Sequence, residues 1–137
     1  CIVHETFSEK KLVQLKVRHP GAVIVAHPEC PESILQHAEH IGSTSSLLKY
    51  VTDSTAKQFI VVTESGIMHQ MKLANPSKEF LPAPPESGCA CNECPFMRMN
   101  TMDKLINCME SMNPQVNVDP AIIDKALLPL NRMLALG

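Results

Sequence analysis

Two short apolar runs constrain the fold of this chain more than any other feature of its sequence. Residues 22–26 read AVIVA and residues 59–62 read FIVV, and neither run contains a polar residue. Short runs without alternation are typical of strands that are buried on both faces of a parallel sheet. The segment KEFLPA at residues 78–83 predicts a third, weaker strand.

Helical patterns lie before, between and after these strands. Ser8 is a good N-cap for the first helix, and Asn100 or Thr101 can cap a later one. The predicted helices cover residues 9–18, 31–42, 43–54, 66–75, 102–112 and 121–136, the last with a kink at Pro129. Strands that alternate with helices predict an α/β fold, with three α/β/α layers built on a short parallel sheet.

Composition and charge argue against several classes of function. The chain has 137 residues and a formal net charge of −2, from 12 basic and 14 acidic side chains. It has no basic block, which argues against a nucleic-acid partner, and no apolar run long enough for a membrane span. Its cysteine content is low for a disulfide-rich secreted domain, so we expect reduced thiols and a cytoplasmic location. The first residue is cysteine rather than methionine, so we expect a fragment of a longer protein.

The stretch CACNECPFM, from Cys89 to Met97, holds three of the six cysteines. Its Cys91-x-x-Cys94 spacing suits a zinc site, an iron–sulfur centre, a redox pair or a disulfide. The composition favours metal binding over disulfides. Cys108 lies within a helical pattern and is expected to be a small buried hydrophobe, and packing is also the favoured role of Cys30.

Polar residues follow the two buried runs directly. His27-Pro28-Glu29 comes after the first run, and Thr63 to Gly66 comes after the second. Because the carboxyl ends of parallel strands share one edge of a sheet, these groups are expected to line one cleft. The segment GSTSS, residues 42–46, begins a helix whose free N–H groups suit a phosphate or carboxylate.

Each of these groups also has a purely local interpretation. His27 suits a hydrogen-bonded strand end, and Glu29 suits the positive end of the next helix. The pairs Ser43 with Thr44 and Thr63 with Glu64 both suit helix caps. The sequence leaves these alternatives open.

Six motifs in order resemble the carboxyl-terminal part of the quinolinate synthase family: CIVHE, HPEC, GSTSSLLKYV, FIVVTESGI, CACNECPFMRMNT and LNRML. The resemblance implies three pseudo-equivalent α/β domains around a central site. It also implies condensation of iminoaspartate with dihydroxyacetone phosphate to quinolinate, with release of phosphate and water, in NAD biosynthesis. A [4Fe–4S] cluster, held by one cysteine from each domain, would act as a Lewis acid. L-aspartate oxidase would be the partner that supplies iminoaspartate.

The resemblance also implies roles for individual residues. Cys1 and Cys94 would be cluster ligands, and the third ligand would lie outside this chain, so the isolated fragment is expected to be inactive. The residues that would contact substrate are His4, His27, Glu29, Ser43 and Thr44, with Glu29 and His27 as the catalytic pair. Residues 1–20 would end the middle domain, and residues 21–137 would form the last domain, with a cysteine loop at 84–97. Cys89 and Cys91 would be extra thiols, which form a regulatory disulfide in some members.

Two other interpretations of the cysteines remain open. Cys1, His4, Cys91 and Cys94 could form a structural zinc site, which would make the chain a binding module rather than an enzyme. Cys91 and Cys94 could also be the redox pair of a thioredoxin-like protein. Pro84, Pro85 and Gly88 precede that pair, whereas a redox pair of this kind lies between a strand and a helix, so this interpretation ranks last.

Overall fold

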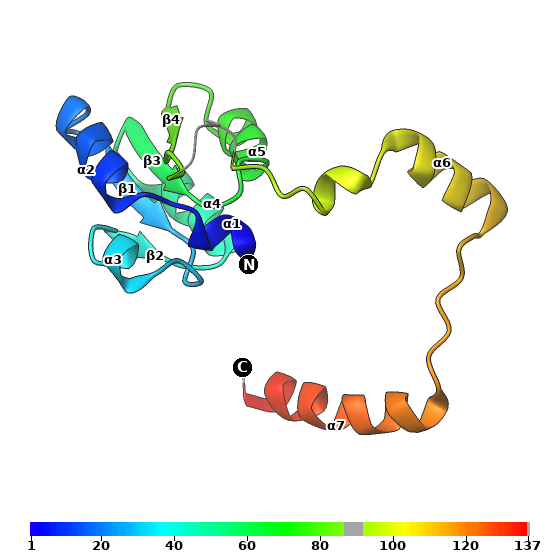
Figure 1. Cartoon of the computed structure of the whole chain (residues 1–137). Coiled ribbons are helices and arrows are strands. Elements are labelled where there is room, and N and C mark those ends of the chain that lie inside the picture. The colour runs from blue at the N-terminus through cyan, green and yellow to red at the C-terminus, as the bar shows by residue number, and fades with distance from the viewer. Residues whose placement is uncertain (87–91, 137) are drawn as a thin grey trace. The chain divides into compact units, whose positions relative to one another are not determined.

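The computed structural model describes residues 1–86 and 92–136 of the chain (Figure 1). The chain divides into two units, Cys1–Met99 and Asn100–Gly137, which are described here one at a time. The first unit carries every strand of the described sheet. Among the described residues, no helix is both long enough and apolar enough to cross a membrane.

The sheet of the first unit has four parallel strands in the order β2-β1-β3-β4. Their bounds are Val23–Ala26 for β1, His40–Ile41 for β2, Gln58–Val62 for β3 and Glu79–Pro82 for β4. The three strands expected from the apolar runs are therefore confirmed. In the centre of the sheet, Val23 to Ala26 of β1 pair with Phe59 to Val62 of β3.

Alternate residues of the central strands face two separate cores. Ile24 of β1 and Ile60 of β3 belong to one core, and Val25 and Val61 belong to the other. All four side chains are almost fully buried, and each such burial stabilises the fold by roughly 1.5–3 kcal/mol. This burial on both faces is the reason that neither apolar run alternates with polar residues.

Helices cover both faces of the sheet (Figure 1). Leu12 of α2 (Glu9–Arg18) and Ile34 of α3 (Glu32–Leu35) pack in the first core. Leu47 of α4 (Thr44–Asp53) and Met71 of α5 (Ile67–Ala74) pack in the second. The predicted three-layer α/β/α arrangement is therefore confirmed for this unit.

The predicted helix over residues 31–42 is wrong in its second half. The helix α3 ends at Leu35, and the chain then enters the edge strand β2. The N–H of Glu39 donates to the carbonyl of Ile24 at 2.9 Å, and the N–H of Gly42 donates to that of Ala26 at 3.1 Å. Buried backbone groups need hydrogen-bond partners, and these bonds supply them along the edge of β1. The side chain of Ile41 in β2 is 44% exposed.

Helix caps follow the local sequence closely. Ser8, Ser43 and Thr101 each accept a hydrogen bond from the backbone N–H three residues later in the chain. Such caps satisfy N–H groups that have no partner within the helix. The predicted starts of the helices after Ser8 and Thr101 are confirmed.

The second unit contains α6 (Met102–Ser111) and α7 (Pro120–Leu136), and α7 continues through Pro129. Many large apolar side chains of both helices are exposed, including Leu105, Met109 and Leu128. Cys108 is partly exposed, so the expectation that it is buried is wrong. Taken by itself, this unit has no buried residue among residues 100–136, so it forms no core of its own that could cover Cys108.

Candidate functional site

The two central strands mark the point where the sheet is wound in opposite directions. From β1 the chain passes through α3 to β2 on one side, and from β3 it passes through α5 to β4 on the other. In open α/β sheets, ligands bind outside the carboxyl ends of strands at such a switch point. The register pairs Ala26 with Val62, so His27 and Thr63 leave the sheet side by side.

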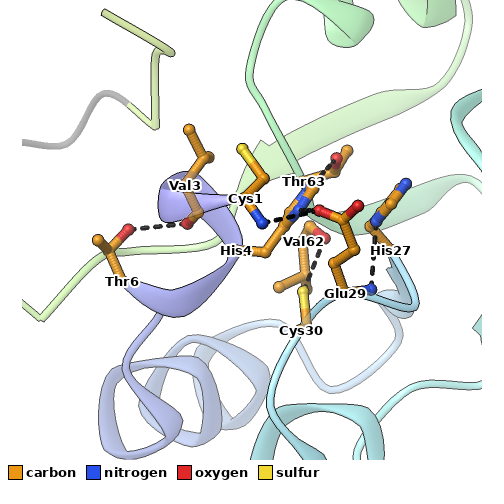
Figure 2. A network of polar contacts seen from close by, with 9 residues as sticks. All are labelled: Cys1, Val3, His4, Thr6, His27, Glu29, Cys30, Val62 and Thr63. Atoms are coloured by element: carbon orange, nitrogen blue, oxygen red, sulfur yellow. Dashed lines mark hydrogen bonds and ion pairs between the residues drawn. The ribbon is translucent and has the colours of Figure 1, made fainter. Parts of the chain in front are cut away.

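His4 links the residues that follow these two strands (Figure 2). It lies in the short helix α1 (Ile2–Glu5) and is only 6% exposed. Its Nδ1 is 2.9 Å from Oε2 of Glu29, and its Nε2 is 3.0 Å from Oγ1 of Thr63. The segment after β1, the segment after β3 and the start of the chain are thereby joined through one imidazole ring.

The partners of His4 determine where its proton lies. An ionised carboxylate can only accept, so Nδ1 carries the hydrogen and donates it to Glu29. In the neutral form of the ring, Nε2 is then an acceptor, and the hydroxyl of Thr63 donates to it. Both ring nitrogens of His4 are therefore engaged by the protein, and His4 orients the carboxylate of Glu29.

Glu29 is ionised at neutral pH. Its pKa is lowered to about 2, first by a hydrogen bond from the amino group of Cys1 and then by the bond from His4. The Cys1 nitrogen lies 3.0 Å from Oε2 of Glu29. In a chain with residues ahead of Cys1 this nitrogen is an uncharged peptide N–H, and His4 is then the main stabilising partner. The side chain of Glu29 is 51% exposed, so its carboxylate is accessible to a ligand.

His27 stacks on His4, with ring centroids 4.3 Å apart and ring planes within 5° of parallel. The backbone N–H of Glu29 donates to Nδ1 of His27 at 3.3 Å. Burial lowers the pKa of His27, and the neighbouring His4 lowers it further. Because its pKa lies below the usual value for histidine, His27 is a neutral imidazole at physiological pH.

Cys30 lies behind this network and is buried, as the sequence predicted. Its Sγ donates to the carbonyl of Val62 at 3.6 Å, and burial raises its pKa to about 11. A thiol with so high a pKa stays protonated and is a poor nucleophile or metal ligand. Cys30 is therefore a packing residue.

The residues after β3 also hold the cysteine loop. The N–H of Cys94 donates to Oε1 of Glu64 at 3.4 Å, and the N–H of Ser65 donates to the carbonyl of Asn92 at 3.0 Å. The side-chain amide of Asn92 donates to the carbonyl of Ala83, just beyond β4. These hydrogen bonds hold the buried Cys94 and its neighbour Asn92 next to the carboxyl ends of β3 and β4.

The interpretation of Thr63 and Glu64 as a helix cap is wrong. The N-cap of α5 is Gly66, and no side chain caps that helix. Thr63 is 2% exposed and bonds to His4, while Glu64 bonds to the N–H groups of Gly66 and Cys94. The sequence placed Thr63 at the edge of the expected cleft, directly after a buried strand, but it gave no sign of the bond to His4.

Ser43 and Thr44 lie at the start of α4, and both are exposed. Oγ of Ser43 accepts from the N–H of Ser46 at 3.3 Å, so its role as a cap is confirmed. The chain is tight here, because a Cβ on Gly42 would lie 2.5 Å from Oγ of Ser46. Anion binding by Ser43 and Thr44 stays a prediction, and no described hydrogen bond joins either residue to the His4 network.

Within residues 1–86 and 92–136, one group of potential metal ligands lies close enough together to hold an ion. It comprises Cys1, His4 and Glu29, whose ligand atoms all lie within 4.8 Å of one another. Cys94 is outside this group. Cysteines that hold one iron–sulfur cluster bind different irons, so this separation does not test Cys94 as a cluster ligand. The predicted thiols Cys89 and Cys91, and any disulfide between them, lie outside the described residues.

Comparison with known proteins gives one consistent result. A family model described as quinolinate synthetase A protein matches residues 1–135. The chain is 55% identical over all 137 residues to a quinolinate synthase of Microcystis aeruginosa, and 56% identical to one of Nostoc punctiforme. It is 52% identical over 134 residues to a quinolinate synthase of Prochlorococcus marinus. The chain spans only 43%, 42% and 40% of the lengths of these three relatives.

Proposed function

The chain belongs to the quinolinate synthetase A protein family, and on that premise we propose that it carries one wall of a quinolinate synthase active site. The proposed reaction condenses iminoaspartate with dihydroxyacetone phosphate, releases phosphate and water, and forms quinolinate for NAD biosynthesis. The longer relatives imply that further segments complete the site. The single observation that carries the proposal is the convergence of His4, His27, Glu29 and Thr63 at the switch point of the sheet.

The proposed cofactor is a [4Fe–4S] cluster, with Cys1 and Cys94 as two of its ligands. The donor chemistry fits, because thiolates are the usual ligands of such clusters. The thiol of Cys1 is exposed beside the carboxylate of Glu29, and Cys94 is held in place by its backbone bond to Glu64. When bound, the cluster would supply a Lewis acid next to the residues that move protons.

Glu29 is the proposed proton-transfer group. The condensation needs protons to be moved at carbon and oxygen, and an ionised, accessible carboxylate can accept them. His4 holds that carboxylate in place from a buried position, with its other nitrogen bonded to Thr63. The proton that Glu29 accepts can be returned to a leaving oxygen later in the reaction.

His27 has a different role in this proposal. Its lowered pKa keeps the ring neutral, so it can donate or accept a hydrogen bond without carrying charge. It lies against His4 and beside Glu29 at the mouth of the network, which suits a residue that binds and orients substrate.

The start of α4 is the proposed anion site. Both substrates are anions, and the chain has no excess of positive charge to attract them. The first N–H groups of α4 and the hydroxyls of Ser43 and Thr44 are local donors for a phosphate or carboxylate. Ser43 can fill both roles, because its oxygen accepts the cap bond while its hydrogen remains free to donate.

The proposed partners are the two small substrates and the L-aspartate oxidase that would supply iminoaspartate. The proposed location is the cytoplasm, where reducing conditions keep Cys1 and Cys94 as thiols. The structural zinc module with Cys1, His4, Cys91 and Cys94 is less well supported. Membership of an enzyme family argues against it, and Cys91 lies outside the described residues.

The test compares Glu29→Gln with Glu32→Gln in a protein of the full length of its relatives, purified without oxygen. Glu29→Gln keeps the shape of the side chain but removes the base, so quinolinate formation should fall by ~10²-fold or more. Glu32→Gln makes the same change at an exposed position on α3 and should leave the rate unchanged. Iron and sulfide are measured in every sample. Equal rates for the two variants at equal iron content would refute the role of Glu29.

A further inference from the structure

We propose that Cys1, His4 and Glu29 also form a binding site for a zinc-like divalent ion when no cluster is bound. Their thiol, imidazole and carboxylate are the three types of group that bind Zn²⁺ in proteins. Their ligand atoms already lie within 4.8 Å of one another. The site shares Cys1 with the proposed cluster, but it does not depend on the proposed function.

The observed spacing needs only small side-chain movements to accept an ion. Zinc–ligand bonds of about 2.0–2.3 Å in a tetrahedron place neighbouring ligand atoms roughly 3.3–3.8 Å apart. Nδ1 of His4 and Oε2 of Glu29 are 2.9 Å apart and must separate slightly. The side chains of Cys1 and Glu29 are 39% and 51% exposed and have room to shift, whereas that of His4 is 7% exposed and serves as the fixed anchor.

Thr63 supports the ligand role of His4. A metal on Nδ1 requires the ring hydrogen to be on Nε2, which then donates to Oγ1 of Thr63 at the present distance of 3.0 Å. A hydroxyl can donate or accept, so Thr63 satisfies Nε2 both with and without the ion. Ligating histidines usually have such a partner on the second nitrogen, and losing it typically weakens metal binding 10–100-fold.

The charges in the site also favour a divalent cation. The thiolate of Cys1 and the carboxylate of Glu29 together balance two positive charges. His27 stacks on the ring of His4, which helps to keep that ring in place. Three protein ligands leave one tetrahedral position open, which is the pattern of zinc sites that bind water or substrate.

The consequence is competition between two metals. The ion and the cluster both need the sulfur of Cys1, so they cannot bind together. A divalent ion held by Cys1, His4 and Glu29 would therefore block cluster assembly until it is removed. This predicts that Zn²⁺ inhibits iron–sulfur reconstitution of the cluster-free protein.

The test uses Co²⁺ as a coloured probe for Zn²⁺, in reduced, cluster-free protein of the full length of the relatives. The parent for the titration carries Cys94→Ala, which removes the Cys91-x-x-Cys94 pair as a competing zinc-type motif. We expect one Co²⁺ per chain, with a thiolate-to-cobalt absorption band that excess Zn²⁺ abolishes. Adding Cys1→Ser should abolish the band, and adding Glu29→Gln should weaken binding at least tenfold.

Thr63→Val and Glu32→Gln complete the series. Thr63→Val should weaken Co²⁺ binding about 10–100-fold, and Glu32→Gln should leave it unchanged. Circular dichroism checks the fold of every variant, and both Cys1 and Glu29 lie at exposed positions. The proposal is overturned if the Cys94→Ala parent gives no thiolate band, or if that band survives Cys1→Ser.

A separate measurement keeps this inference distinct from the proposed function. Iron and sulfide per chain are measured after anaerobic reconstitution of the protein with its native cysteines, with and without prior Zn²⁺. Failure to assemble a cluster without Zn²⁺ would count against the proposed cofactor alone. Full assembly in the presence of one equivalent of Zn²⁺ would overturn the proposed competition.

Discussion

The bond between His4 and Thr63 can be tested by replacing Thr63 with valine. Valine has nearly the same shape as threonine, so the change removes the hydroxyl without leaving a cavity. Thr63 is 2% exposed and His4 is 6% exposed, so water cannot easily replace the lost donor. Nε2 of His4 would then be a buried acceptor without a partner, while Nδ1 remains bonded to Glu29.

The expected loss follows from the cost of an unpaired buried group. Leaving such a group unsatisfied costs about 1–3 kcal/mol, which is more than the net gain from an ordinary hydrogen bond. For a domain of 60–100 residues, each 1 kcal/mol lowers the melting temperature by about 4–8 °C. We therefore expect Thr63→Val to lower the free energy of unfolding by about 1–3 kcal/mol.

The assay is urea unfolding of three variants, with the free energy compared at a constant m-value. Thr55→Val makes the same chemical change at an exposed position and should alter stability by about 0.5 kcal/mol or less. Thr63→Ser keeps the hydroxyl and loses one buried methyl group, which should cost about 0.8 kcal/mol. An equal loss for Thr63→Val and Thr55→Val would refute the inferred role of Thr63.

Three further predictions concern other parts of the site. In the full-length protein, Thr44→Ala should weaken substrate binding by about 1.5–3 kcal/mol if its hydroxyl contacts the anion, and the double change Ser43→Ala with Thr44→Ala should weaken it further. KM for each substrate measures this effect. Unchanged KM values with a lower melting temperature would show that the two residues only cap the helix α4. Cys94→Ala should abolish cluster assembly and Cys108→Ala should not, as iron and sulfide analysis will show; a stable cluster in Cys94→Ala would contradict the ligand assignment. In the chain that begins at Cys1, the pKa of Glu29 is lowered from 4.5 to about 2, so its contribution to stability is complete above about pH 4.5 and is lost as the pH falls towards 2. Glu29→Gln should flatten this part of the acid unfolding curve, and an identical curve would exclude the contribution.

Local sequence was sufficient to predict the helix caps, which depend on residues a few positions away, and the strands that are buried on both faces. Ser8 and Ser43 cap their helices through bonds to residues three positions away, so their role is visible in a short window of sequence. The runs at residues 22–26 and 59–62 could be recognised because both faces of each strand lie against a helix layer. The family could also be recognised, because its motifs are contiguous stretches of sequence.

The strand β2 was decided by the tertiary structure. Residues 34–41 carry a helical pattern, and Ala38 packs on the core as that pattern predicts. The helix nevertheless ends at Leu35, because the edge of β1 is paired by the backbone of Glu39, His40 and Gly42. Backbone pairing of this kind depends on which strand lies nearby, and a pattern of side chains carries no information about it.

The contacts within the candidate site also could not be predicted from local sequence. Sequence placed Glu29 and Thr63 after two strands, but it could not join them through His4, which lies 25 and 59 positions away from them. That junction depends on the register of β1 against β3, which sets His27 beside Thr63, and on the position of α1 at that edge of the sheet. Register is set when both faces of the strands are packed at once, so only the folded molecule determines which polar side chains meet.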